Sequence, residues 1–218
     1  PWGHTYLPAH GPGTRAGIAT LAPALLGQDP RALQHVNRVM DVQLPGHPYA
    51  KSPLDMACWD ILGQSANMPL WMVMGVAEAD PVWANSSIST GSPQEMIALI
   101  EEARAKGYRT HSAKLGGADP AADIARIEGI SAALLPSESV TYDINRAWTP
   151  GVALRGLNAV SDISWVEQPC ETMEECAYVA GHVRQPVLLD ECFHTFQDHL
   201  NAWKMSACAG LKIKPNRL

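Results

Sequence analysis

Short strand-like runs alternate with segments of helical periodicity along the chain from residue 82 onward. The runs have the length and composition of β-strands, and they occupy Val82–Ile88, Tyr108–Leu115, Ser139–Asp143, Ile163–Glu167, Val187–Asp190 and Gly210–Lys214. Helices are predicted between them, at residues 93–106, 119–135, 151–160, 171–180 and 196–206. Alternation of this kind is typical of parallel strands joined by right-handed helical crossovers, so we expect an α/β fold.

Helical periodicity dominates the first eighty residues. Helices are expected at Thr14–Gly27, from Asp29-Pro30 with Asp29 as N-cap, and from Ser52-Pro53 to about Asn67. The turn-forming pair Asp80-Pro81 then marks the predicted boundary between two domains. We expect a helix-rich domain at residues 1–80 and a strand–helix domain at residues 81–218.

Three successive predicted strands end on a carboxylate. Asp143, Glu167 and Asp190 follow one another at intervals of 24 and 23 residues, which is about one strand plus one returning helix. Carboxylates gathered at one edge of a sheet repel one another, so they need a cation, and all-oxygen ligation favours Mg²⁺ over zinc or copper. The pattern predicts a magnesium site with these three ligands.

Two lysines lie in flanking strands of the same kind, Lys114 in the second and Lys212 in the sixth. Lysine, three acids and lysine on consecutive strands indicate acid–base chemistry around a metal. Lys214 lies two residues beyond Lys212 and faces the same side of the strand, so it competes for the same role.

Two architectures are compatible with parallel strands in this order. In an open doubly wound sheet, consecutive strands separate at a switch point, so the three acids need not converge. In a (β/α) barrel, consecutive strands are neighbours whose carboxyl ends share one face, which favours the barrel. No Gly-x-Gly-x-x-Gly follows the first strand, which weakens the dinucleotide-binding alternative. Only six strands are predicted, so the expected fold is a barrel truncated after strand 6.

Composition narrows the class of protein. The 218 residues are 46% hydrophobic and 17% charged, and the net charge is −6, with scattered lysines and arginines. Nucleic acid and membrane are therefore not expected as partners. Five cysteines without C-x-x-C spacing do not indicate a disulfide framework, so a reduced cytoplasmic location is expected. The histidines form no His-x-His pair, which leaves a zinc hydrolase as the weaker rival.

Several segments carry a resemblance to a known family. The helix segment Ala50–Asp60 resembles a signature of the mandelate racemase/muconate lactonizing enzyme branch of the enolase superfamily. Three further segments of this chain resemble the metal-ligand segments of that branch: Asp143-x-Asn145, Trp165–Pro169 and Leu189–Glu191. Leu211–Lys214 resembles its lysine segment on the sixth strand. The resemblance implies a modified (β/α)7β barrel that here lacks its last two strands. It also implies that residues 1–80 are the remainder of an α+β capping domain whose first strands are missing.

One position departs from the pattern of lysine-acting members of this branch. They carry Lys-x-Lys on the second strand, whereas this chain has Ser112-Ala113-Lys114. A second ammonium would lower the pKa of the catalytic lysine by repulsion, and Ser112 cannot do so. A serine at this position resembles the pattern of the subgroup that dehydrates cis-3-hydroxy-L-proline. The loop sequences Tyr6–His10 and Asn145–Trp148 also resemble those of that subgroup.

The resemblance implies a role for each candidate residue. Lys114 and Lys212 would act as acid and base on opposite faces of a small carboxylate substrate, with Mg²⁺ stabilising the charge formed when the α proton leaves. Ser112 would assist departure of the 3-hydroxyl. Asn145 and Glu191 are expected to hold the metal ligands in place, and Trp148 is expected to line the substrate pocket. Trp148 could instead belong to the core. A homo-oligomer is expected.

Three hypotheses for function remain at this point. The first is Mg²⁺-dependent dehydration of cis-3-hydroxy-L-proline to Δ1-pyrroline-2-carboxylate. The second is racemisation or epimerisation of an amino acid or its derivative by the same lysines. The third is a barrel fragment without catalytic activity, which serves as a binding or scaffold protein or no longer functions. Loss of water separates the first from the second, and a Mg²⁺-dependent gain in stability separates both from the third.

Overall fold

The computed structural model describes residues 11–76, 82–116, 119–160 and 165–214. The chain divides into two compact units, residues 1–81 with 214–218, and residues 82–213. Each unit has its own hydrophobic core, so each is described by itself.

The first unit is built from helices in its described part. They are α1 (Gly11–Leu25), α2 (Leu33–Gln43), α3 (Pro48–Ser65) and the short α4 (Leu70–Val73). The first three pack on one another around a small core of Leu21, Val36, Met40, Ala50 and Cys58. Helical apolar periodicity thus produces a three-helix packing.

Two helix starts predicted from the sequence are wrong. Asp29 does not cap a helix, because its carboxylate accepts hydrogen bonds from the backbone and side chain of Arg31 and α2 begins only at Leu33. The third helix starts at Pro48, and Pro53 lies inside it. Both prolines suit a first helical turn, so the sequence does not distinguish which one begins the helix.

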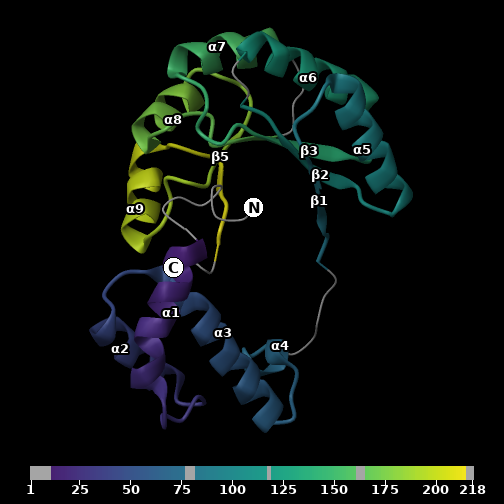
Figure 1. The fold of residues 1–218 in the computed structure, drawn as a ribbon. Coiled ribbons are helices and arrows are strands. Elements are labelled where there is room, and N and C mark those ends of the chain that lie inside the picture. The colour runs from purple at the N-terminus through teal and green to yellow at the C-terminus, as the bar shows by residue number, and fades with distance from the viewer. Residues whose placement is uncertain (1–10, 77–81, 117–118, 161–164, 215–218) are drawn as a thin grey trace. The chain divides into compact units, whose positions relative to one another are not determined.

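The second unit is a six-stranded parallel sheet with the strands in sequence order (Figure 1). The strands are β1 (Asn85–Ile88), β2 (Thr110–Lys114), β3 (Ser139–Asp143), β4 (Trp165–Glu167), β5 (Val187–Leu189) and β6 (Gly210–Leu211). The helices between them are α5 (Pro93–Ala105), α6 (Pro120–Ala133), α7 (Pro150–Ala159), α8 (Met173–Ala180) and α9 (Phe196–Met205). Figure 1 shows these helices along the outer side of the curved sheet. The predicted α/β class is confirmed, and consecutive strands are neighbours.

Side chains of the strands alternate between two faces of the sheet, and the register aligns them across neighbouring strands. Ala113 pairs with Tyr142, and Tyr142 with Val166; these buried side chains face the helices, where the Tyr142 hydroxyl hydrogen-bonds to Ser131 of α6. The next position along each strand faces the opposite way, because side chains alternate. That inner face carries the ends of the strands, at Lys114, Asp143 and Glu167.

Local capping explains where the helices of this unit begin. Ser92, Thr172 and Thr195 each form a capping box, in which the hydroxyl accepts from the backbone of the third helical residue and that residue's carboxylate accepts in return. Each cap starts a helix soon after a strand ends. The caps therefore fix where each helix begins, a few residues after the carboxyl end of the preceding strand.

The third strand, Ser139–Asp143, has the predicted bounds, whereas β1, β2, β5 and β6 are shorter than predicted. β2 ends at Lys114, not Leu115, and β6 spans only Gly210–Leu211, although the Lys212 amide continues the ladder by donating to Leu189. The predicted start of the fourth strand at Ile163 lies outside the described residues.

Candidate metal centre and catalytic site

Three buried carboxylates lie at neighbouring strand ends on the inner face of the sheet. Asp143 closes β3, Glu167 closes β4, and Asp190 follows β5, and each is about 1% exposed. Asp143 pairs directly with Glu167 in register, while Leu188 pairs with Glu167. Asp190 lies two residues beyond Leu188 and so faces the same side.

Each of two lysines reaches one of these acids from another strand. The Lys114 ammonium on β2 donates a hydrogen bond to Oδ2 of Asp143. The Lys212 ammonium, just after β6, donates to Oε2 of Glu167 at 2.6 Å. The side chains of Lys114 and Lys212 are about one third exposed, so both are shielded from water only in part. The two cations approach the carboxylates from different strands of the sheet.

Burial and mutual repulsion perturb the acids. Burial raises the pKa of Glu167 to about 7, assisted by the charge of Asp143 and a hydrogen bond with Asp190, and the Lys212 ammonium opposes this rise. Burial lowers the pKa of Lys114, but the Asp143 carboxylate outweighs it, so the net shift is upward. The Glu167 shift thus reflects burial beside a like charge, and the Lys114 shift reflects attraction to the carboxylates it faces.

The donor set suits a hard divalent cation. The three residues offer oxygen ligands only, and positive charge would relieve the repulsion that raises the pKa of Glu167. Within the described ranges, no three acidic, histidine or cysteine side chains stand in an arrangement that could hold a metal. The ammonium groups of Lys114 and Lys212 lie against Asp143 and Glu167 instead.

Asn145 connects the loop after β3 to the loop after β5. Its backbone amide donates to Oδ1 of Asp143 at 3.0 Å, and its side-chain amide donates to Oε1 of Glu191 at 2.8 Å. A φ of +48° makes this tight turn, a backbone region that asparagine tolerates better than most residues. Burial also raises the pKa of Glu191. Asn145 and Glu191 thus lie beside the carboxylates as an interacting pair.

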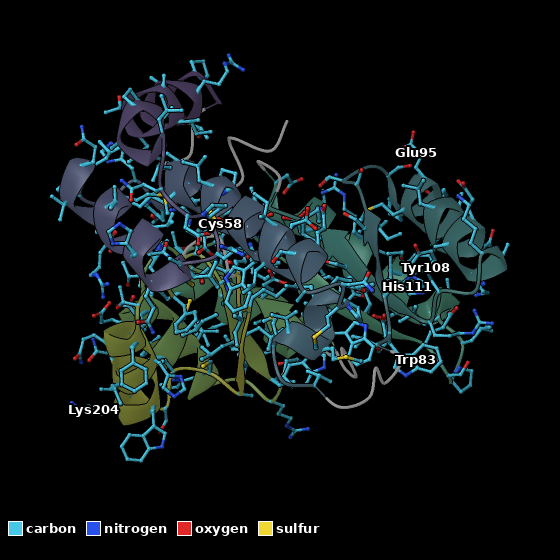
Figure 2. The ribbon with its side chains drawn as sticks, turned by 90° about the horizontal axis from the view of Figure 1, so that it is seen from below. Cys58, Trp83, Glu95, Tyr108, His111 and Lys204 are labelled. Carbon is cyan, nitrogen blue, oxygen red and sulfur yellow. The ribbon has the colours of Figure 1, made fainter. Side chains whose placement is uncertain are left out.

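Ser112 lies on the same face of β2 as Lys114, two residues before it. It is 9% exposed, and in register it lies between Ser87 of β1 and Thr141 of β3. A row of small hydroxyl side chains therefore crosses the inner face two residues before Lys114 and Asp143. His111, one residue earlier, faces the helices and hydrogen-bonds to Ser86 (Figure 2).

Trp148 does not form a wall of this site, which corrects the expectation from the sequence. Its ring packs against Gly156 of α7, with 3.5 Å between the Cη2 atom and the position of a Cβ at Gly156. Its indole N–H donates to Oδ2 of Asp123 at 3.2 Å, and the side chain is buried in the core. A buried tryptophan needs a partner for its N–H, and Asp123 supplies it.

Two buried polar residues near the site were not found by sequence reasoning. Asp123 of α6 accepts from the Gly116 amide at 3.1 Å and from Arg126, and it thereby fastens the loop after β2. Gln168 follows Glu167 directly and is fully buried. The segment Trp165–Pro169 contains Gln168, but nothing in its spacing indicates which groups its carboxamide contacts.

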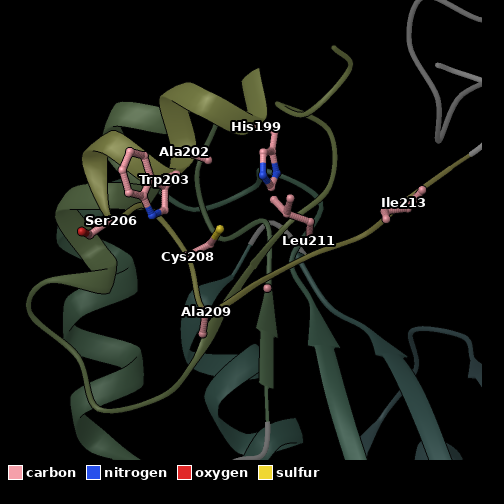
Figure 3. Close-up of a pocket in the computed structure, with 9 residues that line it drawn as sticks. His199, Ala202, Trp203, Ser206, Cys208, Ala209, Leu211 and Ile213 are labelled. Carbon is pink, nitrogen blue, oxygen red and sulfur yellow. The ribbon is translucent and has the colours of Figure 1, made fainter. Parts of the chain in front are cut away.

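A cavity of about 540 Å³ lies between α9 and β6, apart from the carboxylates (Figure 3). Leu211 and Ile213 line it together with His199, Trp203 and Cys208. Because side chains alternate, Lys212 points away from this cavity and toward Glu167. The cavity is thus on the helix side of β6, and it is not the candidate active site.

None of the helices in the described ranges is long and apolar enough to cross a membrane.

Comparison with known families matches nearly the whole chain. Residues 95–218 match the family described as "Enolase C-terminal domain-like", and residues 3–75 match "Mandelate racemase / muconate lactonizing enzyme, N-terminal domain". The two matches follow one another in the order of the two structural units.

Individual relatives agree with this assignment. A cis-3-hydroxy-L-proline dehydratase from Roseibium aggregatum is 42% identical over 88% of this chain and 52% of its own length. An N-succinyl-L-Arg/Lys racemase from Bacillus cereus is 27% identical over 89% of this chain and 54% of its own length. A crystal structure of an enolase superfamily member from Roseovarius nubinhibens ISM, complexed with magnesium, is 66% identical with a TM-score of 0.91; it is matched over all of this chain and 59% of that one.

The chain spans about half the length of these curated relatives. The match to the C-terminal family alone covers more than half of the chain, and the relative from Roseibium aggregatum matches most of it. The predicted resemblance is confirmed: the chain belongs to the enolase superfamily, in its mandelate racemase/muconate lactonizing enzyme branch.

Proposed function

We propose that the protein is a Mg²⁺-dependent hydro-lyase that removes the proton α to a carboxylate and eliminates water. One observation carries the proposal: Lys114 and Lys212 reach a row of three buried carboxylates from different strands, on one face of the sheet. The proposed substrate is cis-3-hydroxy-L-proline, on which a relative from Roseibium aggregatum, 42% identical, is named as acting.

Asp143, Glu167 and Asp190 would hold the Mg²⁺. When bound, the cation would offset the negative charge that develops on the substrate carboxylate as the α proton leaves. The magnesium in the crystal structure of the relative from Roseovarius nubinhibens supports this assignment. Asn145 and Glu191 would keep the loops after β3 and β5 in place beside the ligands.

The two lysines supply complementary proton transfers. In cis-3-hydroxyproline the hydroxyl and the carboxylate lie on one face of the ring, so the C2 hydrogen lies on the other. One lysine, as the neutral amine, would take the C2 proton, and the other, as ammonium, would protonate the leaving oxygen. The C2–H and C3–O bonds break, a C2–C3 double bond forms, and water departs. The enamine then tautomerises to Δ1-pyrroline-2-carboxylate.

Ser112 would act on the leaving group. It lies on the inner face beside Lys114, and a neutral hydroxyl can donate to or accept from the substrate's 3-hydroxyl at low desolvation cost. A charged lysine at this position would be harder to desolvate and would repel the neighbouring ammonium.

The six-stranded sheet would belong to a modified (β/α)7β barrel. Its strands follow sequence order, its helices lie on one side, and the matched structure from Roseovarius nubinhibens is longer than this chain. We assign residues 81–218 to strands 1–6 of that barrel and residues 1–80 to part of a capping domain.

Racemisation or epimerisation is the second candidate. It needs two acid–base groups on opposite faces of the α carbon, and Lys114 and Lys212 could supply them. A racemase of N-succinylated arginine and lysine is among the relatives. Racemisation and epimerisation release no leaving group, whereas dehydration releases water.

Incubation of the full-length protein with cis-3-hydroxy-L-proline and Mg²⁺ tests the proposal. Mass spectrometry should find a product lighter than the substrate by one water, and chelation of Mg²⁺ should stop its formation. A product with the same mass as the substrate but the opposite configuration at C2 would instead show that the protein is a racemase or epimerase. No change in either would leave a non-catalytic barrel.

A further inference from the structure

Gln168 occupies an unusual position between two of the proposed metal ligands. It follows Glu167 directly, it is fully buried, and its φ is +40°. A non-glycine residue in this left-handed region is strained, so the surrounding contacts must hold it there. Its side chain takes no part in the proton transfers described above.

The carboxamide of Gln168 fastens the end of β4 to the chain after β5. Its Oε1 atom accepts from the Asp190 amide at 2.9 Å and from the Cys192 amide at 3.3 Å. Its Nε2 atom donates to the carbonyl of Cys170 at 3.0 Å. Oxygen and nitrogen are both matched by partners of the right kind, so the orientation of the amide is fixed.

The backbone of Gln168 adds bonds to both neighbouring strands. Its N–H donates to the Leu188 carbonyl on β5, and its carbonyl accepts from the Arg146 amide in the loop after β3, both at 2.9 Å. This one residue therefore connects the three strand ends that carry Asp143, Glu167 and Asp190.

We infer that Gln168 is a positioning residue that fixes Asp190 relative to Glu167 and so sets the affinity of the site for Mg²⁺. The inference rests on the proposed function, since it assumes that these carboxylates bind the cation. Metal sites depend on such outer contacts, because they hold the ligands in place before the metal arrives. Without the Oε1 acceptor, the Asp190 amide is left buried without its partner, and the backbone that carries this ligand must move.

Gln185 provides a matched control. Its carboxamide donates to two backbone carbonyls, those of Leu157 at 2.8 Å and Val160 at 3.1 Å. It lies just before β5 begins, at the end of the sheet opposite the carboxylates. Gln185→Met removes a partly buried glutamine amide that bonds to the backbone, and it costs stability without touching the proposed ligands.

Calorimetric titration of Mg²⁺ into the full-length wild type, Gln168→Met and Gln185→Met tests the inference. Gln168→Met should weaken Mg²⁺ binding by about 10-fold or more, the size typical of outer-contact mutations, while Gln185→Met stays close to wild type. If Gln168→Met does not fold, Gln168→Asn, whose amide is one methylene too short to reach its partners, carries the same prediction.

The possible outcomes separate the inference from the proposed function. Wild type that binds no Mg²⁺ would overturn the proposed function and the inference with it. Wild type that binds Mg²⁺ with Gln168→Met equally tight would overturn the inference alone. Equal weakening in both variants would also overturn it, because a general loss of packing would then explain the effect.

Discussion

The Lys212 ammonium donates to Oε2 of Glu167 at 2.6 Å, from the strand two places away from β4 in the sheet. The bond spans β5, the strand that Asp190 follows, so the Lys212 side chain reaches across one strand to Glu167. Leu211 and Ile213, on either side of Lys212, line the cavity on the helix side of the sheet. This alternation places Lys212 on the inner face.

Replacement of Lys212 by alanine should lower turnover by about 10²–10⁴-fold, the usual contribution of a positioned acid or base. Mg²⁺ affinity should change little, because the proposed ligands remain. Lys214→Ala is the register control, and it should keep most of the activity. Activity retained in Lys212→Ala and lost in Lys214→Ala would transfer the catalytic role to Lys214. Steady-state kinetics of the two variants decide between them.

Ser112→Ala separates assistance to the leaving group from assistance to proton removal. Dehydration should slow more than exchange of the C2 proton with solvent, because only dehydration requires departure of the 3-hydroxyl. Parallel measurement of product formation and deuterium uptake gives the two rates from one sample. Equal losses would mean that Ser112 acts through Lys114, and no loss in either would make it structural filler.

Trp148→Phe tests the corrected role of this residue. We expect a loss of about 1.5–3 kcal/mol in the free energy of unfolding, because the Asp123 carboxylate loses the indole donor. The KM for the substrate should stay near the wild-type value. Trp203→Phe, at an exposed position on α9, should change stability by no more than about 0.5 kcal/mol. An increase in KM without loss of stability would restore Trp148 to the substrate wall.

A buried ion pair on the helix side of the sheet makes stability depend on pH. Arg104 donates two hydrogen bonds to Glu138, whose side chain is fully buried, and this interaction lowers the pKa of Glu138 to about 2. The stabilisation is fully present above pH 4.5, and it is lost as the pH falls toward 2. Protonation of the partner His111 acts in the same direction, because burial lowers its pKa.

Glu138→Gln should therefore cost about 1.5–3 kcal/mol in urea unfolding at pH 7 and progressively less as the pH falls below 4.5. As the control, Glu102→Gln removes an ion pair between two exposed side chains, Glu102 and Lys106, and should change stability much less than Glu138→Gln does at pH 7. The same loss at pH 7 and at pH 3 would contradict the role assigned to the charge of Glu138.

Strand order and family could be predicted because they depend on patterns local to the chain. Strand-like segments between helical ones indicate β1 to β6, and carboxylates at nearly equal intervals indicate one edge of a sheet. Helix starts were harder, since Pro48 and Pro53 satisfy the same rule and only packing selects Pro48. The extent of β6 also depends on the neighbouring strand, which no local pattern describes.

The surroundings of the site could be predicted only in part. Trp148 turns toward α7 because Gly156 leaves room for its ring and because Asp123, 25 residues away along the chain, accepts its N–H. Gln168 contacts groups from the loops after β3, β4 and β5. Such contacts exist only once the strands have assembled, so spacing along the chain cannot reveal them.

The central claim is that this site removes the proton α to a carboxylate with the help of Mg²⁺. Proton NMR of cis-3-hydroxy-L-proline with the full-length protein in D₂O measures that step directly. We predict that the C2 proton signal disappears in the presence of Mg²⁺, as substrate is converted to product, and that it persists when Mg²⁺ is chelated. A C2 signal that persists in the presence of Mg²⁺, or that disappears equally fast without it, would contradict the account.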